Sequence, residues 1–149
     1  MEITEFLTQD RTLVDVRARD KTHLIGEIGR EFARLVPALK PEVVETALRA
    51  REQLGSTGLG SGFALPHARI EGLSGYAGLF MRLAKPIEFD AIDAKPVKLV
   101  FVLLIPAETT VSHVAALAAI SRRFRDAELV AKLGKAETQA SAFGILTDR

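Results

Sequence analysis

The sequence contains no cysteine, and neither basic nor acidic residues predominate. The absence of cysteine excludes disulfide bonds, thiolate metal sites and cysteine nucleophiles. The 20 Lys and Arg residues are balanced by 19 Asp and Glu residues, which leaves a net charge of +1. The chain therefore has no overall field that would attract nucleic acid or a membrane surface, and a charged partner must be met by a local patch.

Long apolar runs are also missing. The longest extends from residue 97 to residue 107, is interrupted by Lys98, and is far shorter than the roughly 20 residues that span a bilayer. We interpret it as a buried strand and expect no membrane insertion. The acidic residues Glu2 and Glu5 near the start are unlike the basic beginning of a secretory signal, so we predict a cytoplasmic location.

The chain has the size and composition of one globular domain, with 149 residues of which 48% are apolar. No repeat, low-complexity tract or linker-like segment divides it. We therefore predict a single domain over residues 1–149.

Strand-like and helix-like patterns alternate along the sequence. Strands are predicted at 12–16, 63–66, 76–83 and 99–105, and helices after the N-cap Asp20 and at 41–54, 111–124, 127–133 and 137–143. This interleaving predicts an α/β fold, a three-layer α/β/α domain with a central mixed β-sheet flanked by helices. Residues 84–96 are predicted to be an irregular connection, and the strand order does not follow from the sequence.

Residues 55–62 contain four glycines in eight positions, which predicts a loop with unusual backbone angles. Gly55 and Gly60 have the spacing of a phosphate-binding P-loop, but Ser61 and Gly62 stand where its Lys and Ser/Thr would be. A dinucleotide fingerprint has a different glycine spacing and follows a strand, whereas this segment follows a predicted helix. The glycines therefore do not indicate a nucleotide site.

His67 is the residue whose surroundings most suggest chemistry. It follows Pro66, and Arg69 lies two residues later, on the same face of an extended segment. An imidazole with a pKa of about 6.5 is largely neutral in the cell and can accept a phosphoryl group. The dianionic product would need arginines, a second imidazole or backbone N–H groups nearby. From the residues alone, a structural or surface histidine remains the alternative.

Three blocks of the sequence resemble a known family. Residues 49–71, which read RAREQLGSTGLGSGFALPHARIE, closely resemble the active-site signature of the mannitol/fructose-type EIIA domains, type 2, of the bacterial sugar phosphotransferase system. Residues 86–97 and 105–114 are similar to further blocks of that family. Among its members, the chain is most similar to the nitrogen-regulatory branch, which consists of free-standing EIIA domains.

The resemblance implies a role for each matched residue. His67 corresponds to the phosphorylated histidine, Arg51 to an arginine that contacts phosphate oxygens, and His113 to a second histidine near the site. It also implies supporting phosphoryl-binding roles for Ser56, Thr57, Gly58, Gly60 and Arg69. Ala68 and Ala115 depart from many nitrogen-branch members, which have Gly and a further His there, so the arrangement of donors is expected to differ.

Two functions from different classes follow from the resemblance. The first is a phosphocarrier that accepts a phosphoryl group on His67 from a phosphohistidine on HPr or its nitrogen-branch paralogue NPr. The second is a regulator whose phosphorylation selects its partners, with potassium transporters and sensor kinases as targets. We expect both in one protein, without a cofactor. The alternative is an EIIA of a fructose/mannitol-type uptake system that passes the group to an EIIB, and the lack of an attached EIIB sequence favours regulation.

A metal site formed by the three histidines is a more distant alternative. His23, His67 and His113 lie 44 and 46 residues apart, and such gaps carry no ligand-spacing signal. We therefore predict no metal ligands.

Overall fold

The computed structural model describes residues 2–108 and 113–148. Within these residues the chain forms two 3₁₀ turns, five helices and six strands. In chain order they are η1 (Ile3–Glu5), η2 (Gln9–Arg11), β1 (Thr12–Val16), α1 (Lys21–Leu35), α2 (Pro41–Gln53), β2 (Gly58–Gly60), β3 (Phe63–Ala64), β4 (His67–Ile70), β5 (Ala77–Ile87), β6 (Val97–Pro106), α3 (Val114–Phe124), α4 (Ala127–Lys135) and α5 (Gln139–Thr147).

The strands form one mixed sheet in the order β1-β5-β6-β3-β2, with β4 also paired to β6. β5 and β6 are antiparallel, whereas β1 is parallel to β5, and β3 and β4 are parallel to β6. The long apolar run from residue 97 is the central strand β6, most of whose side chains are buried. This confirms the predicted mixed sheet.

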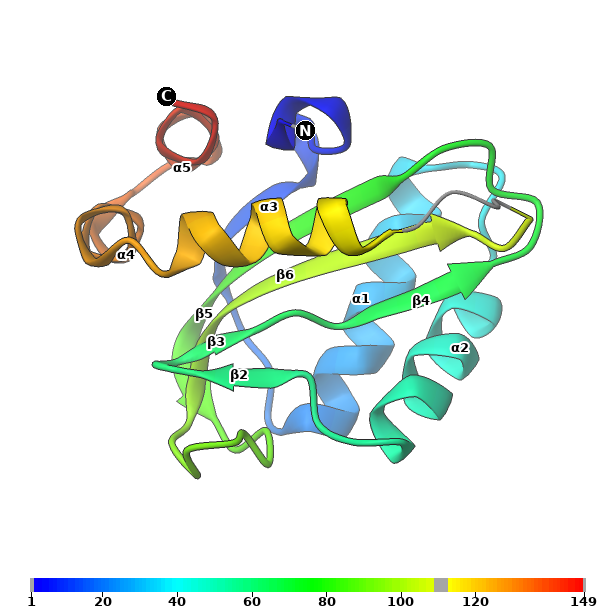
Figure 1. The fold of residues 1–149 in the computed structure, drawn as a ribbon, viewed down its shortest axis with the longest axis horizontal. Coiled ribbons are helices and arrows are strands. Elements are labelled where there is room, and N and C mark those ends of the chain that lie inside the picture. The colour runs from blue at the N-terminus through cyan, green and yellow to red at the C-terminus, as the bar shows by residue number, and fades with distance from the viewer. Residues whose placement is uncertain (1, 109–112, 149) are drawn as a thin grey trace.

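Helices cover both faces of the sheet, as Figure 1 shows, with α1 and α2 on one side and α3 across the other. The core under α1 and α2 contains Leu24, Ile28, Phe32 and Leu48 packed against sheet residues such as Val100. The opposite core joins η1, α3, α4 and α5 to the other face of the strands. The predicted three-layer α/β/α architecture is therefore confirmed.

β3 and β4 are two parts of one line of pairing along β6. Phe63 pairs with Leu99 and His67 with Leu103, so the register is the same on both sides of the break. Pro66 lies in the break and has no backbone N–H to donate to a ladder. His67 therefore begins β4, which continues to Ile70. The sequence had predicted a strand at 63–66 that ends before His67.

The predicted glycine loop was wrong in part, because residues 58–60 form β2, antiparallel to β3. Ser61 and Gly62 connect the two strands with φ angles of 54° and 79°. Two consecutive residues with positive φ make the tight turn whose twist suits a β-hairpin. The glycines thus shape a hairpin beside the site.

The two predicted N-caps are confirmed, and helix ends were predicted less well. Asp20 and Asp126 accept hydrogen bonds from backbone N–H groups in the first turns of α1 and α4. Thr138, which was not predicted, caps α5 in the same way. Gly134 was predicted to end its helix, but α4 continues through it to Lys135. The last helix was predicted at 137–143 and extends over Gln139–Thr147, because Leu146 is buried. Residues 111 and 112, where the third helix was predicted to start, lie outside the described residues.

β5 is longer than predicted and takes in residues 84–87 of the expected irregular connection. Its register with β6 shifts between Arg82 and Ile87, where Pro86 lies. A proline in a strand is tolerated at such an irregularity. No helix in the described part of the chain is long and apolar enough to cross a membrane.

Candidate active site around His67

His67 lies at the first position of β4, on the sheet face toward α3. The alternation of the strand buries Ala68 and Ile70 in the core under α1 and α2, which leaves His67 and Arg69 on the opposite face. The His67 side chain is half-buried, and Arg69 is exposed. The imidazole is therefore held by the fold and still open to a visiting molecule.

One hydrogen bond determines which ring nitrogen of His67 can react. Nδ1 lies 2.7 Å from the carbonyl oxygen of Leu65. A carbonyl oxygen can only accept, so Nδ1 carries the proton and donates it. The lone pair of the neutral ring is then on Nε2, which is the ring nitrogen that can act as a nucleophile.

Burial lowers the pKa of His67 below its ordinary value. The hydrogen bond to the Leu65 carbonyl opposes this effect, and the positive charge of Arg51 and the neighbouring His113 lower the pKa further, against a small opposite effect of Glu52. The sum favours the neutral imidazole. A neutral ring is the form that has a lone pair for nucleophilic attack.

Three other predicted residues lie around this imidazole. Arg51, in the last turn of α2, and His113, the N-cap of α3, both act electrostatically on His67. Nη2 of Arg69 is 3.4 Å from Nδ1 of His113. With the arginine as donor, a neutral His113 carries its proton on Nε2, where it can donate to an anion.

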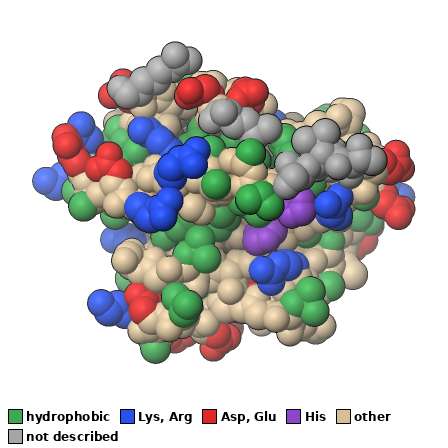
Figure 2. Space-filling model, viewed as in Figure 1, with side chains coloured by type: hydrophobic (Ala, Val, Ile, Leu, Met, Phe, Trp, Pro, Cys, Tyr) green, Lys and Arg blue, Asp and Glu red, His purple; other side chains and the backbone are tan. Residues whose placement is uncertain are grey.

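Arg51, His67, Arg69 and His113 form the histidine cluster, in which α2, β4 and the N-cap of α3 each contribute side chains. α2 packs against β4, and Nη1 of Arg51 donates to the Gly55 carbonyl at 2.9 Å. Figure 2 shows two histidine side chains next to each other on this face, with basic side chains on both sides of them. The arrangement can hold a dianionic group on Nε2 of His67.

The hydroxyl groups of Ser56 and Thr57 donate hydrogen bonds to acceptors within the protein. Oγ of Ser56 donates to the Phe89 carbonyl at 2.7 Å, and Oγ1 of Thr57 donates to the Glu52 carboxylate. A contact between these hydroxyls and a phosphoryl group stays a prediction.

Gly58 and Gly60 form the edge strand β2 and face the connection after β5. A Cβ on Gly58 would lie 2.8 Å from the Cα of Ala91, so only glycine lets the two segments approach this closely. Gly60 has a φ of 97° and lies near Asp93, which accepts from the Ser61 N–H at 2.9 Å. Their predicted role in phosphoryl binding stays a prediction.

Sequence reasoning missed one part of this region, the ion pair between Lys21 and Glu52. Lys21 begins α1 and Glu52 follows Arg51 in α2, and their Nζ and Oε2 atoms are 2.7 Å apart. Glu52 also accepts from the backbone N–H of Thr57 at 3.2 Å. The position of Glu52 within the matched block was the available signal, but its burial depends on α1 and could not be read from the sequence.

Two apolar side chains close in sequence to Arg51 and His113 are exposed. Leu54 is 84% exposed and lies three residues after Arg51, and Val114 is 65% exposed and follows His113. Exposed apolar side chains beside polar groups are typical of surfaces that bind other proteins.

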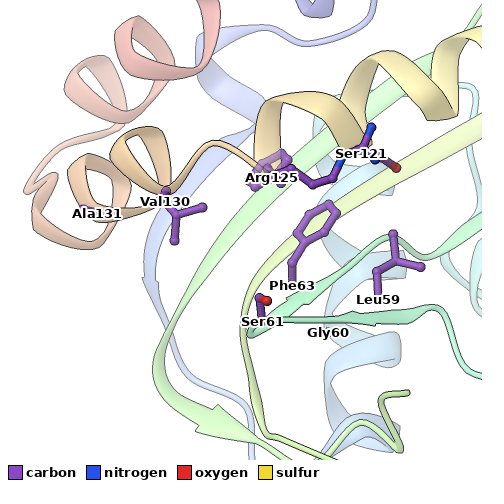
Figure 3. A pocket seen from close by; sticks show the side chains of 10 residues that line it. Leu59, Gly60, Ser61, Phe63, Ser121, Arg125, Val130 and Ala131 are labelled. Atoms are coloured by element: carbon purple, nitrogen blue, oxygen red, sulfur yellow. The ribbon is translucent and has the colours of Figure 1, made fainter. Parts of the chain in front are cut away.

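A separate groove lies between the β2–β3 hairpin and the junction of α3 and α4, shown in Figure 3. Its volume is about 590 Å³. The rings of Phe63 and Phe124 stack at its base with centroids 4.2 Å apart, while Leu59, Val130 and Arg125 line its walls. The lining includes none of the four residues of the histidine cluster. In the described part of the chain, no group of three or more His, Asp or Glu side chains is placed to hold a metal ion.

Comparison with known proteins gives consistent similarities. A sequence model of the family described as the phosphoenolpyruvate-dependent sugar phosphotransferase system, EIIA 2, matches residues 5–149. Nitrogen regulatory proteins of Escherichia coli (strain K12) and Pseudomonas aeruginosa are 36% and 34% identical to the chain, and each match covers 99% of it and 91% or 96% of the relative. The crystal structure of the nitrogen regulatory protein IIA-Ntr from Neisseria meningitidis is similar with a TM-score of 0.90 and 36% identity, over 97% of this chain and 99% of that one.

Proposed function

The chain belongs to the EIIA 2 family of the phosphoenolpyruvate-dependent sugar phosphotransferase system, and we propose that it is a phosphocarrier that accepts a phosphoryl group on Nε2 of His67. The observation that carries the proposal is the hydrogen bond from Nδ1 to the Leu65 carbonyl, which leaves Nε2 with the lone pair. The lowered pKa of His67, caused chiefly by burial, supports the same nucleophile. We place the protein in the cytoplasm, where its partners would be.

The transfer is a displacement between two imidazoles. The lone pair of Nε2 attacks the phosphorus of a phosphohistidine on a carrier protein of the HPr or NPr type. The Nε2–P bond forms while the P–N bond to the carrier ring breaks, and the electron pair of that bond returns to the carrier nitrogen. The proton stays on Nδ1 of His67, hydrogen-bonded to the Leu65 carbonyl, so no proton moves between the proteins.

The surrounding residues have separate parts in this step. The guanidinium of Arg51 suits two parallel hydrogen bonds to phosphate oxygens, and Arg69 adds a second positive charge at the rim. His113 donates from Nε2 while Arg69 binds its Nδ1. Each charge-assisted hydrogen bond contributes about 1.5–3 kcal/mol, so two or three of them move the transfer equilibrium by several powers of ten.

Labelling with radioactive phosphoenolpyruvate tests this function. Incubation with enzyme I and the carrier should label the wild-type protein, and the label should be lost in acid, as expected of a phosphohistidine. His67→Ala should remain unlabelled, whereas His23→Ala, which changes a histidine in α1, should be labelled like the wild type. Equal labelling of His67→Ala would refute the proposal.

We further propose that phosphorylation of His67 selects the regulatory partners of the protein. The similarity to nitrogen regulatory proteins supports regulation. A phosphoryl group adds nearly two negative charges to a surface that carries Arg51 and Arg69, which repels acidic partners and attracts basic ones. Transporters for potassium and sensor kinases are the classes of target that we expect.

Affinity capture from cell extract with the two states tests the switch. The phosphorylated wild type, the unmodified wild type and His67→Ala are used as baits. Partners held by the unmodified protein should also be held by His67→Ala and be released by phosphorylation. Identical partners for both states would refute the switch, and an EIIB that accepts the label would point to sugar uptake.

A further inference from the structure

A chain of contacts connects the N-terminus of α1 to His67. It begins with the ion pair between Lys21 and Glu52. The two side chains are mostly buried, with exposures of 20% for Lys21 and 7% for Glu52. Nζ of Lys21 also donates to the Phe89 carbonyl at 3.2 Å and lies 4.5 Å from the centre of the Phe89 ring. A buried carboxylate requires a cation and hydrogen-bond donors, and this position supplies the cation.

The second step leads from Glu52 to Thr57. Its two carboxylate oxygens lie 3.2 and 3.3 Å from the backbone nitrogen of Thr57, and Oε1 also accepts from the Thr57 hydroxyl. Thr57 is buried, with 2% of its surface exposed. Both the backbone and the side chain of Thr57 are thus held by one carboxylate.

The third step leads from Thr57 to the reacting ring. The Thr57 carbonyl accepts from the Leu65 N–H at 2.9 Å, and the Leu65 carbonyl accepts from Nδ1 of His67 at 2.7 Å. Leu65 lies in the break between β3 and β4, where the pairing with β6 is interrupted. The hydrogen bond to Thr57 therefore helps to fix the carbonyl that defines the His67 tautomer.

From this continuous chain we propose that Glu52, neutralised by Lys21, is a positioning residue for His67. The Glu52 charge has a small direct effect on His67, whose pKa it raises. The positioning role is separate from this effect: Glu52 holds Thr57, and through it the Leu65 carbonyl, in place. Loss of this support lets the ring proton move to Nε2, which removes the nucleophilic lone pair. The consequence for phosphoryl transfer rests on the proposed function, whereas the consequence for the tautomer does not.

Two isosteric variants of α2 test the proposal. Glu52→Gln preserves the shape of the side chain and removes the charge that binds Lys21. Glu45→Gln is the matched control, because Glu45 also pairs with a basic side chain, that of Arg49 at 2.5 Å, on the same helix. The tautomer of His67 is read from its ring ¹⁵N chemical shifts, the transfer rate from initial labelling by the phosphorylated carrier, and folding from circular dichroism.

Glu52→Gln should show a measurable fraction of the Nε2–H tautomer and a labelling rate about tenfold lower, as for other supporting residues around a reacting group. Glu45→Gln should show the Nδ1–H tautomer and the wild-type rate. A merely structural role of Glu52 would lower the melting temperature without changing the tautomer. A folded Glu52→Gln protein with the wild-type tautomer and rate would overturn the proposal.

A second variant decides the matter if Glu52→Gln does not fold. Lys21→Gln removes the cation and leaves the hydrogen bonds of Glu52 to Thr57, so it should change the tautomer and the rate in the same direction by a smaller factor. An unchanged tautomer in Lys21→Gln would then overturn the proposal. If wild-type His67 accepts no label from any carrier, the proposed function fails, and the tautomer comparison still decides whether Glu52 positions the ring.

Discussion

At the scale of single residues, the proposed reactivity of His67 depends on a backbone carbonyl. Leu65 precedes a proline, and its carbonyl accepts the Nδ1 proton of a ring two residues later. This hydrogen bond raises the pKa of His67, but the burial of the ring lowers the pKa by more, so the neutral form is favoured. The lowered pKa of His67 therefore favours the same neutral ring that the proposed reaction requires.

The lowered pKa of His67 predicts a stability that decreases in weakly acidic solution. The unfolded chain, in which a histidine has a pKa of about 6.5, binds a proton at pH values where the folded protein still holds the neutral ring. The contribution is fully present above the unfolded pKa and is lost as the pH falls through the folded pKa. Urea unfolding of the wild type and His67→Gln from about pH 7.5 to about pH 5 measures it. The free energy of unfolding should fall less steeply for His67→Gln, and parallel curves would contradict the prediction.

Arg51 is predicted to stabilise the transferred group directly. Loss of one charge-assisted hydrogen bond costs about 1.5–3 kcal/mol, so Arg51→Ala should lower the labelling of His67 by about ten- to a hundredfold. Arg49→Ala is the matched control, since Arg49 lies on the same helix and binds Glu45 and the Thr22 carbonyl instead. Similar labelling of the two variants would show that Arg51 does not contact the phosphoryl group.

At the scale of elements, the close packing of α1 on α2 places both Arg51 and Glu52. Gly29 of α1 lies against the start of α2, and a Cβ there would be 2.7 Å from the Pro41 carbonyl oxygen. That oxygen belongs to the backbone and can move only with the helix. The short distance between α1 and α2 therefore depends on the absence of a side chain at Gly29.

Gly29→Ala should destabilise the fold by about 1–3 kcal/mol, because the two helices must separate to admit the methyl group. Gly134→Ala is the control in α4, where an added Cβ meets no atom within 4 Å. There, alanine should be neutral or stabilise the helix by about 0.5–1 kcal/mol. Thermal unfolding measures both, and equal melting temperatures would disprove the close contact at Gly29.

Element boundaries could be predicted where a local signal defined them. Asp20 and Asp126 cap their helices because a carboxylate can reach the backbone N–H groups two or three residues later. Gly134 misled the prediction, because a glycine is tolerated inside a helix when packing holds the next turn. The strand at 58–60 was missed because its pairing with β3 is a contact that glycine content does not indicate.

At the scale of the whole molecule, we expect the histidine cluster and the exposed side chains of Leu54 and Val114 to form one docking face for the proposed carrier. Leu54 is the C-cap of α2, three residues after Arg51, and Val114 begins α3, next to His113. A carrier that delivered a phosphoryl group to Nε2 of His67 would be expected to cover these side chains. Burial of such side chains supplies much of the affinity in protein interfaces.

Leu54→Asp should therefore weaken binding of the carrier by about tenfold, the effect of losing an interface contact worth more than 1 kcal/mol. Ile92→Asp is the control, because Ile92 is 86% exposed, like Leu54 at 84%, and lies in the connection between β5 and β6. Neither change should alter folding, since both side chains are in water. Calorimetric titration with the carrier measures the affinities, and an equal loss for both variants would contradict a docking role of Leu54.

The sequence by itself determined the alternation of helices and strands and the caps of α1 and α4, and its resemblance to a known family predicted Arg51, His67, Arg69 and His113 as site residues. These features depend on residue type and on spacing over a few positions, which are the local signals that helix caps, turns and sequence motifs provide. Only the tertiary structure decided the tautomer of His67, the meeting of Arg51, Arg69 and His113, and the burial of Glu52 against Lys21. The physical reason is that the clustered charges and the Lys21–Glu52 pair join residues far apart in the chain, whose distances are set by how the helices pack on the sheet, and that the bond from His67 to Leu65, although local, requires the backbone geometry of the break between β3 and β4.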